Sequence, residues 1–295
     1  MKPPPQPYFS VITPVLNGRH DIHGYVEALQ SQTCRDWEAI VVDDGSSDGG
    51  IELLRRLTTG DTRFRLTRNT LPRQIPGPYQ ARNVGLSLAR GRFVCFLDID
   101  DRWLPHKLES QNTRLKHNPE IKLLYSAYIR ARRGAASGRT RPAPPLLPPH
   151  GWINIANPVP MLTACVQREA IAGLHFAAQH HEDYLFWHAL LQRLQPSQIA
   201  DDRAPLAIYC IHTASISSNK LQATSWIWQC YRRLGYSRPV AAAAMLARGL
   251  LQAWLLWRES TTPPIQLWSR RDEQATQGSV GLCRSPRASE TGQRH

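Results

Sequence analysis

Two clusters of aspartates are the residues of this chain best suited to chemistry. Asp43 and Asp44 follow the apolar run 37–42, and Asp98-Ile99-Asp100-Asp101 follows the apolar run 92–97. Neighbouring carboxylates repel each other and raise each other's pKa, so they are unfavourable without a counter-charge. Mg²⁺ or Mn²⁺ removes this penalty, because these ions bind one or two protein carboxylates together with substrate phosphates. The clusters therefore predict a divalent metal ion that holds a phosphorylated substrate.

Each cluster taken alone also has a purely structural interpretation. Aspartate ends strands and stabilises the turns that follow them. For an isolated Asp-x-Asp the structural interpretation is the more common one. Two clusters that each end an apolar strand favour the chemical interpretation, provided that the two strands end at the same place.

The first 110 residues contain the elements that would bring the clusters together. Apolar runs alternate with segments of helical periodicity, which predicts a parallel sheet with helices on both faces. Right-handed crossovers place the carboxyl ends of such strands at one edge, where ligands bind. Strands are expected at 8–13, closed by Pro14, and at 37–42, 64–67 and 92–97; helices are expected at 21–32, around 51–57 and at 78–89.

Composition limits the class of protein. The 36 Lys and Arg residues exceed the 23 Asp and Glu residues, which gives a net charge of +13. Such a field attracts phosphates, nucleic acid or an anionic membrane. The six cysteines have no Cys-x-x-Cys or metal-ligand spacing, and the first residues lack the apolar stretch of a signal peptide. We therefore expect a cytoplasmic protein.

Residues 8–112 resemble glycosyltransferase family 2, a large family of inverting enzymes with the GT-A fold. The resemblance lies in the order and spacing of four main blocks: SVITPVLN at 10–17, VVDDGSSD at 41–48, GPYQARNVGL at 77–86 and FLDIDDRWLP at 96–105. It implies a bacterial-type nucleotide-sugar transferase. The expected fold is α/β, a Rossmann-like and mostly parallel sheet with flanking helices and a C-terminal helical extension.

The resemblance also implies a domain organisation. Residues 1–220 would form the catalytic domain, with a nucleotide-sugar-binding half at 1–112 and an acceptor half at 113–220. Residues 221–269 would form the helical extension, and the polar residues 270–295 a disordered tail. Within the acceptor half, the Gly-, Arg- and Pro-rich segment 130–149 is expected to be a mobile basic loop.

The resemblance assigns the donor site residue by residue. Asp44 would accept the imide N–H of a uracil-type base, in a pocket lined by Pro14 and its neighbours, and a carboxylate suits that donor. Arg82 would lie near the diphosphate or shape its pocket; a surface salt bridge is an equally simple role. The other positions implied are Asn17 and Asp43 for donor binding, Asp98 and Asp100 near ribose and metal, and Asp100, Asp101 and His212 for the metal, with a structural role equally open for His212.

The catalytic base is expected in the second half of the chain. Glu182 and Asp183 resemble the family's Glu-Asp element ahead of a helix. Asp183 would remove the proton of the acceptor hydroxyl while the sugar inverts. A plain helix N-cap is the alternative role for Asp183.

The predicted function is transfer of a sugar from a nucleoside diphosphate, of UDP type, to an acceptor hydroxyl with inversion. The acceptor would be a saccharide or a lipid-linked molecule in the synthesis of cell-surface polysaccharide or glycolipid. A catalytically inactive family member and a basic nucleic-acid-binding module are the alternatives. Nucleic-acid-binding motifs are absent from the sequence, so we expect no nucleic-acid partner.

The Trp- and Arg-rich segment 226–257 has two interpretations. It suits a helix at a membrane interface, which would make the protein peripheral at the inner face of the plasma membrane. It also suits a core helix that packs on the catalytic domain, which is the more common case.

Overall fold

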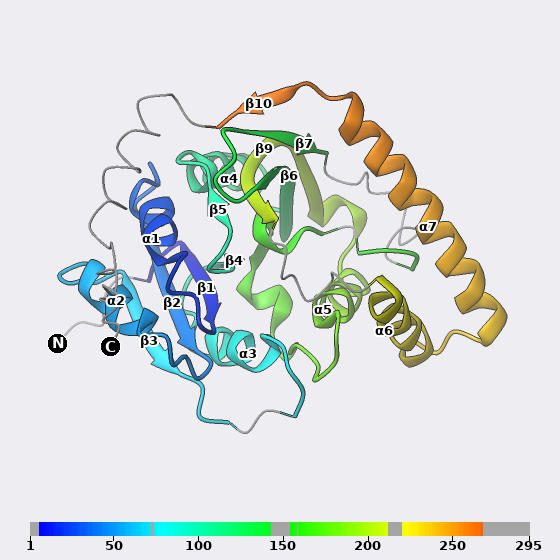
Figure 1. Ribbon diagram of the computed structural model, residues 1–295, viewed down its shortest axis with the longest axis horizontal. Coiled ribbons are helices and arrows are strands. Elements are labelled where there is room, and N and C mark those ends of the chain that lie inside the picture. Colours follow the sequence, from blue (N-terminus) through cyan, green and yellow to red (C-terminus); the bar gives the residue numbers. More distant parts are fainter. Residues whose placement is uncertain (1–5, 72–73, 143–153, 158, 212–219, 268–295) are drawn as a thin grey trace, which may run out of the picture.

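Strand β1 (Phe9–Val15) lies inside a ten-stranded sheet whose order is β10-β7-β6-β8-β4-β1-β2-β3, with β9 paired to both β5 and β6 (Figure 1). This computed structural model describes residues 6–71, 74–142, 154–157, 159–211 and 220–267. The predicted α/β class with flanking helices and C-terminal helices is confirmed. The sheet is mixed, with parallel pairs in the first half and mainly antiparallel pairs in the second.

The first half of the chain forms the parallel part of the sheet. β1 pairs in parallel with β2 on one side and with β4 on the other. Val11 packs in the cluster that contains α1, and Ile12 packs in the cluster that contains α3, because successive strand residues face opposite sides. The elements are α1 (Ile22–Gln30), β2 (Trp37–Asp43), α2 (Gly50–Leu57), β3 (Phe64–Arg68), α3 (Tyr79–Leu88) and β4 (Phe93–Phe96).

The expected end of β1 at Pro14 is wrong by two residues. Pro14 lies inside the strand opposite Val42, and the strand ends at Val15. The fixed φ of proline lies within the extended region, so the ring does not stop the strand.

The second half of the chain extends the sheet beyond β4. β8 (Cys165–Gln167) pairs antiparallel with both β4 and β6 (Leu123–Arg132). β9 (Ile199–Ile211) runs parallel to β6 and antiparallel to the short β5 (Arg102–Trp103). Helix α4 (Lys107–His117) packs in the same cluster as α1, and α5 (Glu182–Leu191) packs in the same cluster as α3.

The expected mobile loop at 130–149 is wrong for its first part. β6 continues to Arg132, and β7 (Ser137–Arg141) pairs with it antiparallel. Arg139 and Arg141 donate hydrogen bonds to groups of the C-terminal helix α7 (Arg238–Thr261), so both side chains are paired within the fold. Residues 143–149 lie outside the described residues.

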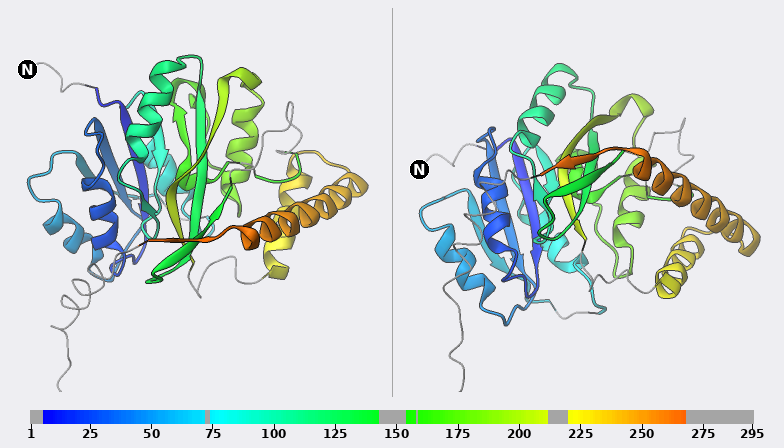
Figure 2. Two further views of the ribbon diagram at one scale, coloured as in Figure 1. Left: turned by 90° about the horizontal axis from the view of Figure 1, so that it is seen from above. Right: turned by 45° about the horizontal axis from the view of Figure 1, so that its top comes forward.

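The C-terminal elements form an arm that returns to the sheet. It comprises α6 (Lys220–Arg233), α7 (Arg238–Thr261) and β10 (Pro264–Gln266), which pairs with β7. In both views of Figure 2, α6 and α7 lie at the end of the molecule opposite α1 and α2. The expected tail at 270–295 lies outside the described residues.

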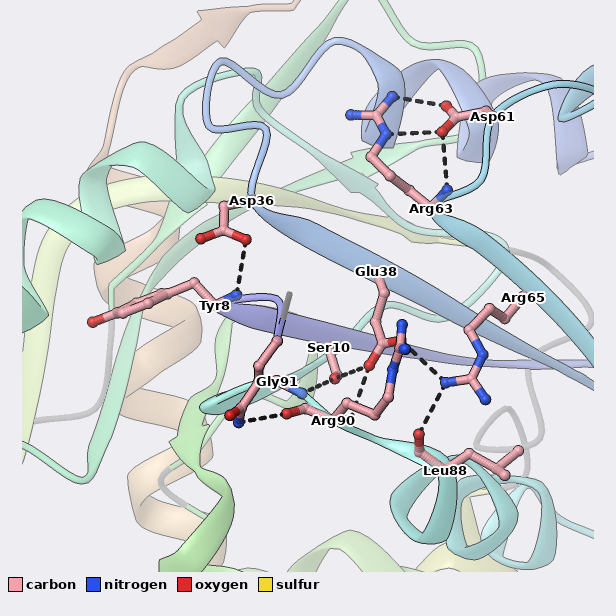
Figure 3. A network of polar contacts seen from close by, with 11 residues as sticks. Tyr8, Ser10, Asp36, Glu38, Asp61, Arg63, Arg65, Leu88, Arg90 and Gly91 are labelled. Atoms are coloured by element: carbon pink, nitrogen blue, oxygen red, sulfur yellow. Dashed lines mark hydrogen bonds and ion pairs between the residues drawn. The ribbon is translucent and has the colours of Figure 1, made fainter. Parts of the chain in front are cut away.

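A network of polar contacts at the amino end of the parallel strands centres on the buried carboxylate of Glu38 (Figure 3). Glu38 accepts hydrogen bonds from the hydroxyl of Ser10 (2.7 Å), from the backbone N–H and guanidinium of Arg90 (2.9 and 2.8 Å) and from Arg65 (3.1 Å). Burial opposes ionisation, but these donors outweigh it and lower the Glu38 pKa. The network joins β1, β2, β3 and the segment before β4.

Candidate active site

The two predicted aspartate clusters lie at the same edge of the sheet. Asp43 and Asp44 follow β2, and Asp98 to Asp101 follow β4; β1 lies between these two strands and runs parallel to both. The carboxyl ends of β2 and β4 are therefore neighbours, as the alternation of strands and helices predicts.

Asp43 and Asn17 shape the loops at this edge. The Asp43 carboxylate accepts the backbone N–H groups of Gly45 (3.2 Å) and Ser46 (2.8 Å). Asn17 adopts a positive φ of 53°, and its side-chain oxygen accepts the backbone N–H of Ser47 (2.9 Å). These bonds join the loop after β1 to the loop after β2. Both side chains thus have a structural task beside the donor-binding role implied by the resemblance.

Asp44 is buried and is held by a residue that the sequence prediction omits. Its carboxylate accepts the side-chain N–H of Asn69 at 2.7 Å. The backbone N–H of Asn69 in turn donates to the carbonyl of Asp43 at 2.8 Å. Asn69 follows β3 directly, so the rule that selected the ends of β2 and β4 would also have found it.

Arg82 joins the two halves of the chain. Its guanidinium is buried and donates to both carboxylate oxygens of Asp98 (2.8 and 3.0 Å) and to Glu182 (2.7 Å). Burial disfavours the charged guanidinium, yet the carboxylates of Asp98 and Glu182 outweigh it and raise the Arg82 pKa. Arg82 therefore fixes the start of α5 against the end of β4.

More carboxylates lie around the guanidinium of Arg82 than its single positive charge can neutralise. Burial raises the Glu182 pKa to about 7, and the charge of Asp183 adds to this effect while Arg82 opposes it. Asp101 is also buried, and burial together with the charges of Asp100 and Asp98 raises its pKa well above the usual range. Excess negative charge at this edge favours the binding of a cation.

Asp101 has a backbone partner from a distant strand. Its carboxylate accepts the N–H of Cys210 in β9 at 3.0 Å. This contact uses the main chain, so it does not depend on the side chain at position 210.

Asp183 lies in the first turn of α5 and is not its N-cap. The helix starts at Glu182, and the preceding residue, His181, is left-handed with a φ of 58°. The Asp183 carboxylate accepts the side-chain N–H of Asn157 at 2.8 Å. The N-cap alternative for Asp183 is therefore wrong, and Asn157 orients the carboxylate.

Comparison with known proteins identifies the class of this site. Residues 10–167 match the family model described as glycosyl transferase family 2. The chain belongs to glycosyl transferase family 2. This glycosyltransferase is 31% identical over 220 residues to the UDP-Glc:alpha-D-GlcNAc-diphosphoundecaprenol beta-1,3-glucosyltransferase WfgD of Escherichia coli, covering 74% of this chain and 83% of that protein. It is 30% identical over 231 residues to the putative teichuronic acid biosynthesis glycosyltransferase TuaG of Bacillus subtilis, covering 78% of this chain and 89% of that one.

Solved structures share the fold of this glycosyltransferase. The mannosyltransferase PcManGT of Pyrobaculum calidifontis, in complex with GDP-Man and Mn²⁺, superposes with a TM-score of 0.59 at 17% identity and covers 95% of this chain and 82% of its own. S. aureus TarS 1–349 in complex with UDP-GlcNAc gives a TM-score of 0.58 at 18% identity and covers 75% of this chain, which spans 64% of that structure. The GT-A fold expected from the sequence is confirmed.

The contacts described above do not include two of the predicted site residues, Pro14 and His212. Pro14 lies buried in β1, opposite Val42, close to the carboxyl edge. His212 lies outside the described residues, one residue beyond the end of β9.

Proposed function

We propose that this family 2 glycosyltransferase moves a sugar from a UDP-type donor to an acceptor hydroxyl and inverts the anomeric centre. One observation carries the proposal: Arg82 connects Asp98, at the edge that bears both aspartate clusters, to the Glu182-Asp183 element. A donor bound along the aspartates would therefore have a candidate base within the same site.

Asp44 is the proposed reader of the nucleobase. A carboxylate accepts the imide N–H of uracil, and Asn69 holds this carboxylate at the end of β2. Cytosine has an acceptor nitrogen at the equivalent ring position, so it would face the carboxylate without a proton. The named activity of WfgD, which uses UDP-Glc, supports this choice.

The proposed cofactor is Mg²⁺ or Mn²⁺. Among the described residues, no group of three or more His, Cys, Asp or Glu side chains is arranged to hold a metal ion by itself. The donor set fits a cation that binds together with the donor, because Asp100 and Asp101 offer hard oxygen ligands and diphosphate oxygens complete the shell. When bound, the cation supplies Lewis-acid stabilisation of the departing diphosphate.

Asp183 is the proposed general base. It would take the proton of the acceptor hydroxyl as that oxygen bonds to the anomeric carbon. The bond between the anomeric carbon and the diphosphate oxygen breaks, and the nucleoside diphosphate leaves with its electron pair. Asn157 holds the carboxylate in place, while Arg82 positions the first turn of α5 through Glu182.

The proposed acceptor is a lipid-linked saccharide of cell-envelope synthesis. WfgD is named for a diphosphoundecaprenol-linked acceptor, and TuaG for teichuronic acid synthesis. A lipid-linked acceptor requires the enzyme to work at a membrane, so we place this glycosyltransferase at the cytoplasmic face, in peripheral contact through its C-terminal helices.

The deciding experiment is a screen of nucleotide sugars and nucleotides for a rise in melting temperature, with Mg²⁺ or Mn²⁺ and with a chelator. We expect stabilisation by UDP and one UDP-sugar that depends on the metal, and little by CDP. Equal stabilisation by CDP would remove Asp44 as the base reader. Donor binding without any transfer or donor hydrolysis would favour the inactive-member alternative.

A further inference from the structure

Helix α7 exposes a continuous apolar face. Between 239 and 257, every exposed residue of the helix is apolar, glycine or proline. The most exposed of the large side chains are Leu246, Leu250 and Trp257, which are 69%, 67% and 62% exposed. At about 1.5 Å per residue the face is roughly 27 Å long. An exposed apolar face of this length marks an interaction site.

The opposite face of α7 is fixed to the sheet. Glu259 is buried and receives hydrogen bonds from Arg130 (2.9 Å) and Arg141 (3.1 Å), and Arg141 also donates to Gln252 (2.8 Å). Leu255 is buried on the same side. Because these contacts set the rotation of the helix, the exposed leucines and tryptophan cannot turn inwards.

The surroundings of this face are positively charged. Between 222 and 267 the sequence has one acid, Glu259, and this acid is buried in ion pairs with Arg130 and Arg141. The guanidinium of Arg258 lies 5.0 Å from the ring centre of Trp254, so an interfacial aromatic and a cation lie side by side. The exposed basic residues of this region are Arg232, Arg233, Arg238 and Arg258.

We propose that the outward face of α7 lies flat on the surface of an anionic phospholipid bilayer. The apolar side chains would enter the boundary between headgroups and acyl chains, and the flanking arginines would pair with lipid phosphates. The functional role of this face rests on the lipid-linked acceptor proposed above. Binding of the face to lipid does not itself require catalysis.

The anchoring contacts favour this flat orientation over a membrane-spanning one. By length and composition alone α7 could cross a membrane, and only 22% of its apolar window is buried in the protein, so it is not a core helix. A spanning helix would have to leave the sheet and carry Arg248 and Glu259 into hydrocarbon, which is strongly unfavourable. A flat helix keeps the contacts of Glu259 and Gln252 intact.

Charge also favours lipid over the two other occupants. A second copy of the chain would bring two arginine-flanked faces together, and like charges repel. Residues 268–295 contain five arginines against three acids, so this segment repeats the charge of the face and does not complement it. Anionic lipid provides both the apolar layer and the opposite charge.

The face is coupled to the site through α6. Tyr231 of α6 packs edge-on against Tyr184 of α5, with ring centres 6.1 Å apart. Ala241 and Ala244 of α7 belong to the same buried cluster. The bilayer surface would thus take a fixed orientation relative to Asp183, at the start of α5, where a lipid-linked acceptor has to present its hydroxyl.

Flotation of the full-length protein with vesicles tests the proposal. We expect binding to phosphatidylcholine vesicles that contain phosphatidylglycerol and weak binding to phosphatidylcholine alone. Leu246→Gln with Leu250→Gln should reduce binding at least about tenfold, because two exposed leucines lose their burial in lipid. Leu71→Gln, at an exposed leucine after β3, is the matched control and should leave binding unchanged.

Arg238→Gln and Arg258→Gln test the charge separately. Each should weaken binding to the anionic vesicles about fivefold at low salt, and the difference should vanish at high salt. Unfolding curves of all variants should match the wild type, since every substituted side chain is exposed.

Two results would overturn the proposal. One is wild-type binding that the leucine substitutions leave unchanged. The other is a wild-type protein that does not bind vesicles. If that protein also forms a dimer that Leu246→Gln and Leu250→Gln dissociate, the face belongs to a second copy of the chain. UDP-dependent stabilisation of the same variants distinguishes this failure from failure of the proposed function, since donor binding should persist when lipid binding is lost.

Discussion

Two buried glutamates at opposite ends of the parallel strands differ in how their charge is treated. Glu38, at the amino end, receives hydrogen bonds from Ser10, Arg65 and Arg90, and its pKa is lowered. Glu182, at the carboxyl end, shares Arg82 with Asp98 and lies beside Asp183, and its pKa is raised to about 7. The donors around Glu38 favour its ionised form, whereas the single guanidinium near Glu182 does not offset the effects of burial and of Asp183.

The difference separates a structural site from the proposed functional one. A carboxylate surrounded by donors stabilises the fold at neutral pH. Carboxylates that share one guanidinium leave excess negative charge, which a bound cation can neutralise. Perturbed and undercompensated groups of this kind concentrate at active sites.

The largest effect is expected at the proposed base. Asp183→Asn should lower kcat by roughly 10²- to 10⁴-fold, because the amide cannot accept the acceptor proton. Donor-dependent thermal stabilisation should remain. Asp36→Asn, an exposed aspartate at the amino end of the strands, is the control and should transfer sugar normally. Full turnover by the Asp183 variant would exclude this residue from the mechanism.

Glu182→Gln should have the next largest effect on activity. Loss of the charge weakens the Arg82 bridge and lets the start of α5 move, which should lower kcat by about tenfold to a hundredfold. Measured against pH, the wild-type rate should fall as pH drops through about 7, and this acidic limb should shift in the variant. A variant with an unchanged rate and pH profile would make Glu182 a purely structural residue.

Glu38→Gln should lower the stability of the fold and leave the catalytic activity unchanged. The variant loses charge-assisted hydrogen bonds from two arginines, so we expect a loss of about 2 kcal/mol in the free energy of unfolding. The arginine side chains are partly exposed and can be rehydrated, which limits the loss. Urea unfolding measures it, and kcat of the folded fraction should equal the wild-type value.

The pH dependence of stability should have opposite sign at the two glutamates. Glu38 has a lowered pKa in the folded state, so its stabilising contribution is present above the unfolded pKa and is lost as pH falls. Glu182 has a raised pKa, so its contribution is lost as pH rises from 4.5 to about 7. Relative to the wild type, Glu182→Gln should gain stability as pH rises from 4.5 to about 7, while the deficit of Glu38→Gln should shrink in acid. Parallel curves for the two variants would contradict the comparison.

The smallest effect is expected at Asn69. Asn69→Ala removes the hydrogen bond that holds Asp44 in position, so the affinity for UDP should fall about fivefold, which corresponds to roughly 1 kcal/mol. Calorimetry with UDP measures the change. An unaltered affinity would separate Asn69 from the donor site.

The sequence by itself determined the sheet edge and its aspartates. Alternation of apolar runs with helical segments is a local pattern, and chain handedness then brings the ends of β2 and β4 together. The family blocks added the fold and the class of enzyme. The predicted end of β1 was wrong because the backbone angle of Pro14 is compatible with a strand. The predicted loop at 130–149 was wrong in its first part because Arg130, Arg139 and Arg141 pair with groups of α7, which are distant in the sequence.

Only the tertiary structure decided how the charges pair. Arg82 and Glu182 are separated by 100 residues, and Asp101 meets the backbone of Cys210 across 109 residues. Likewise, the sequence of α7 suits both a core helix and a membrane helix, and the burial of Glu259 against Arg130 and Arg141 decides which face points outwards. Periodicity is a property of neighbouring residues, whereas the partner of a buried charge depends on which distant segments the fold brings within hydrogen-bonding distance.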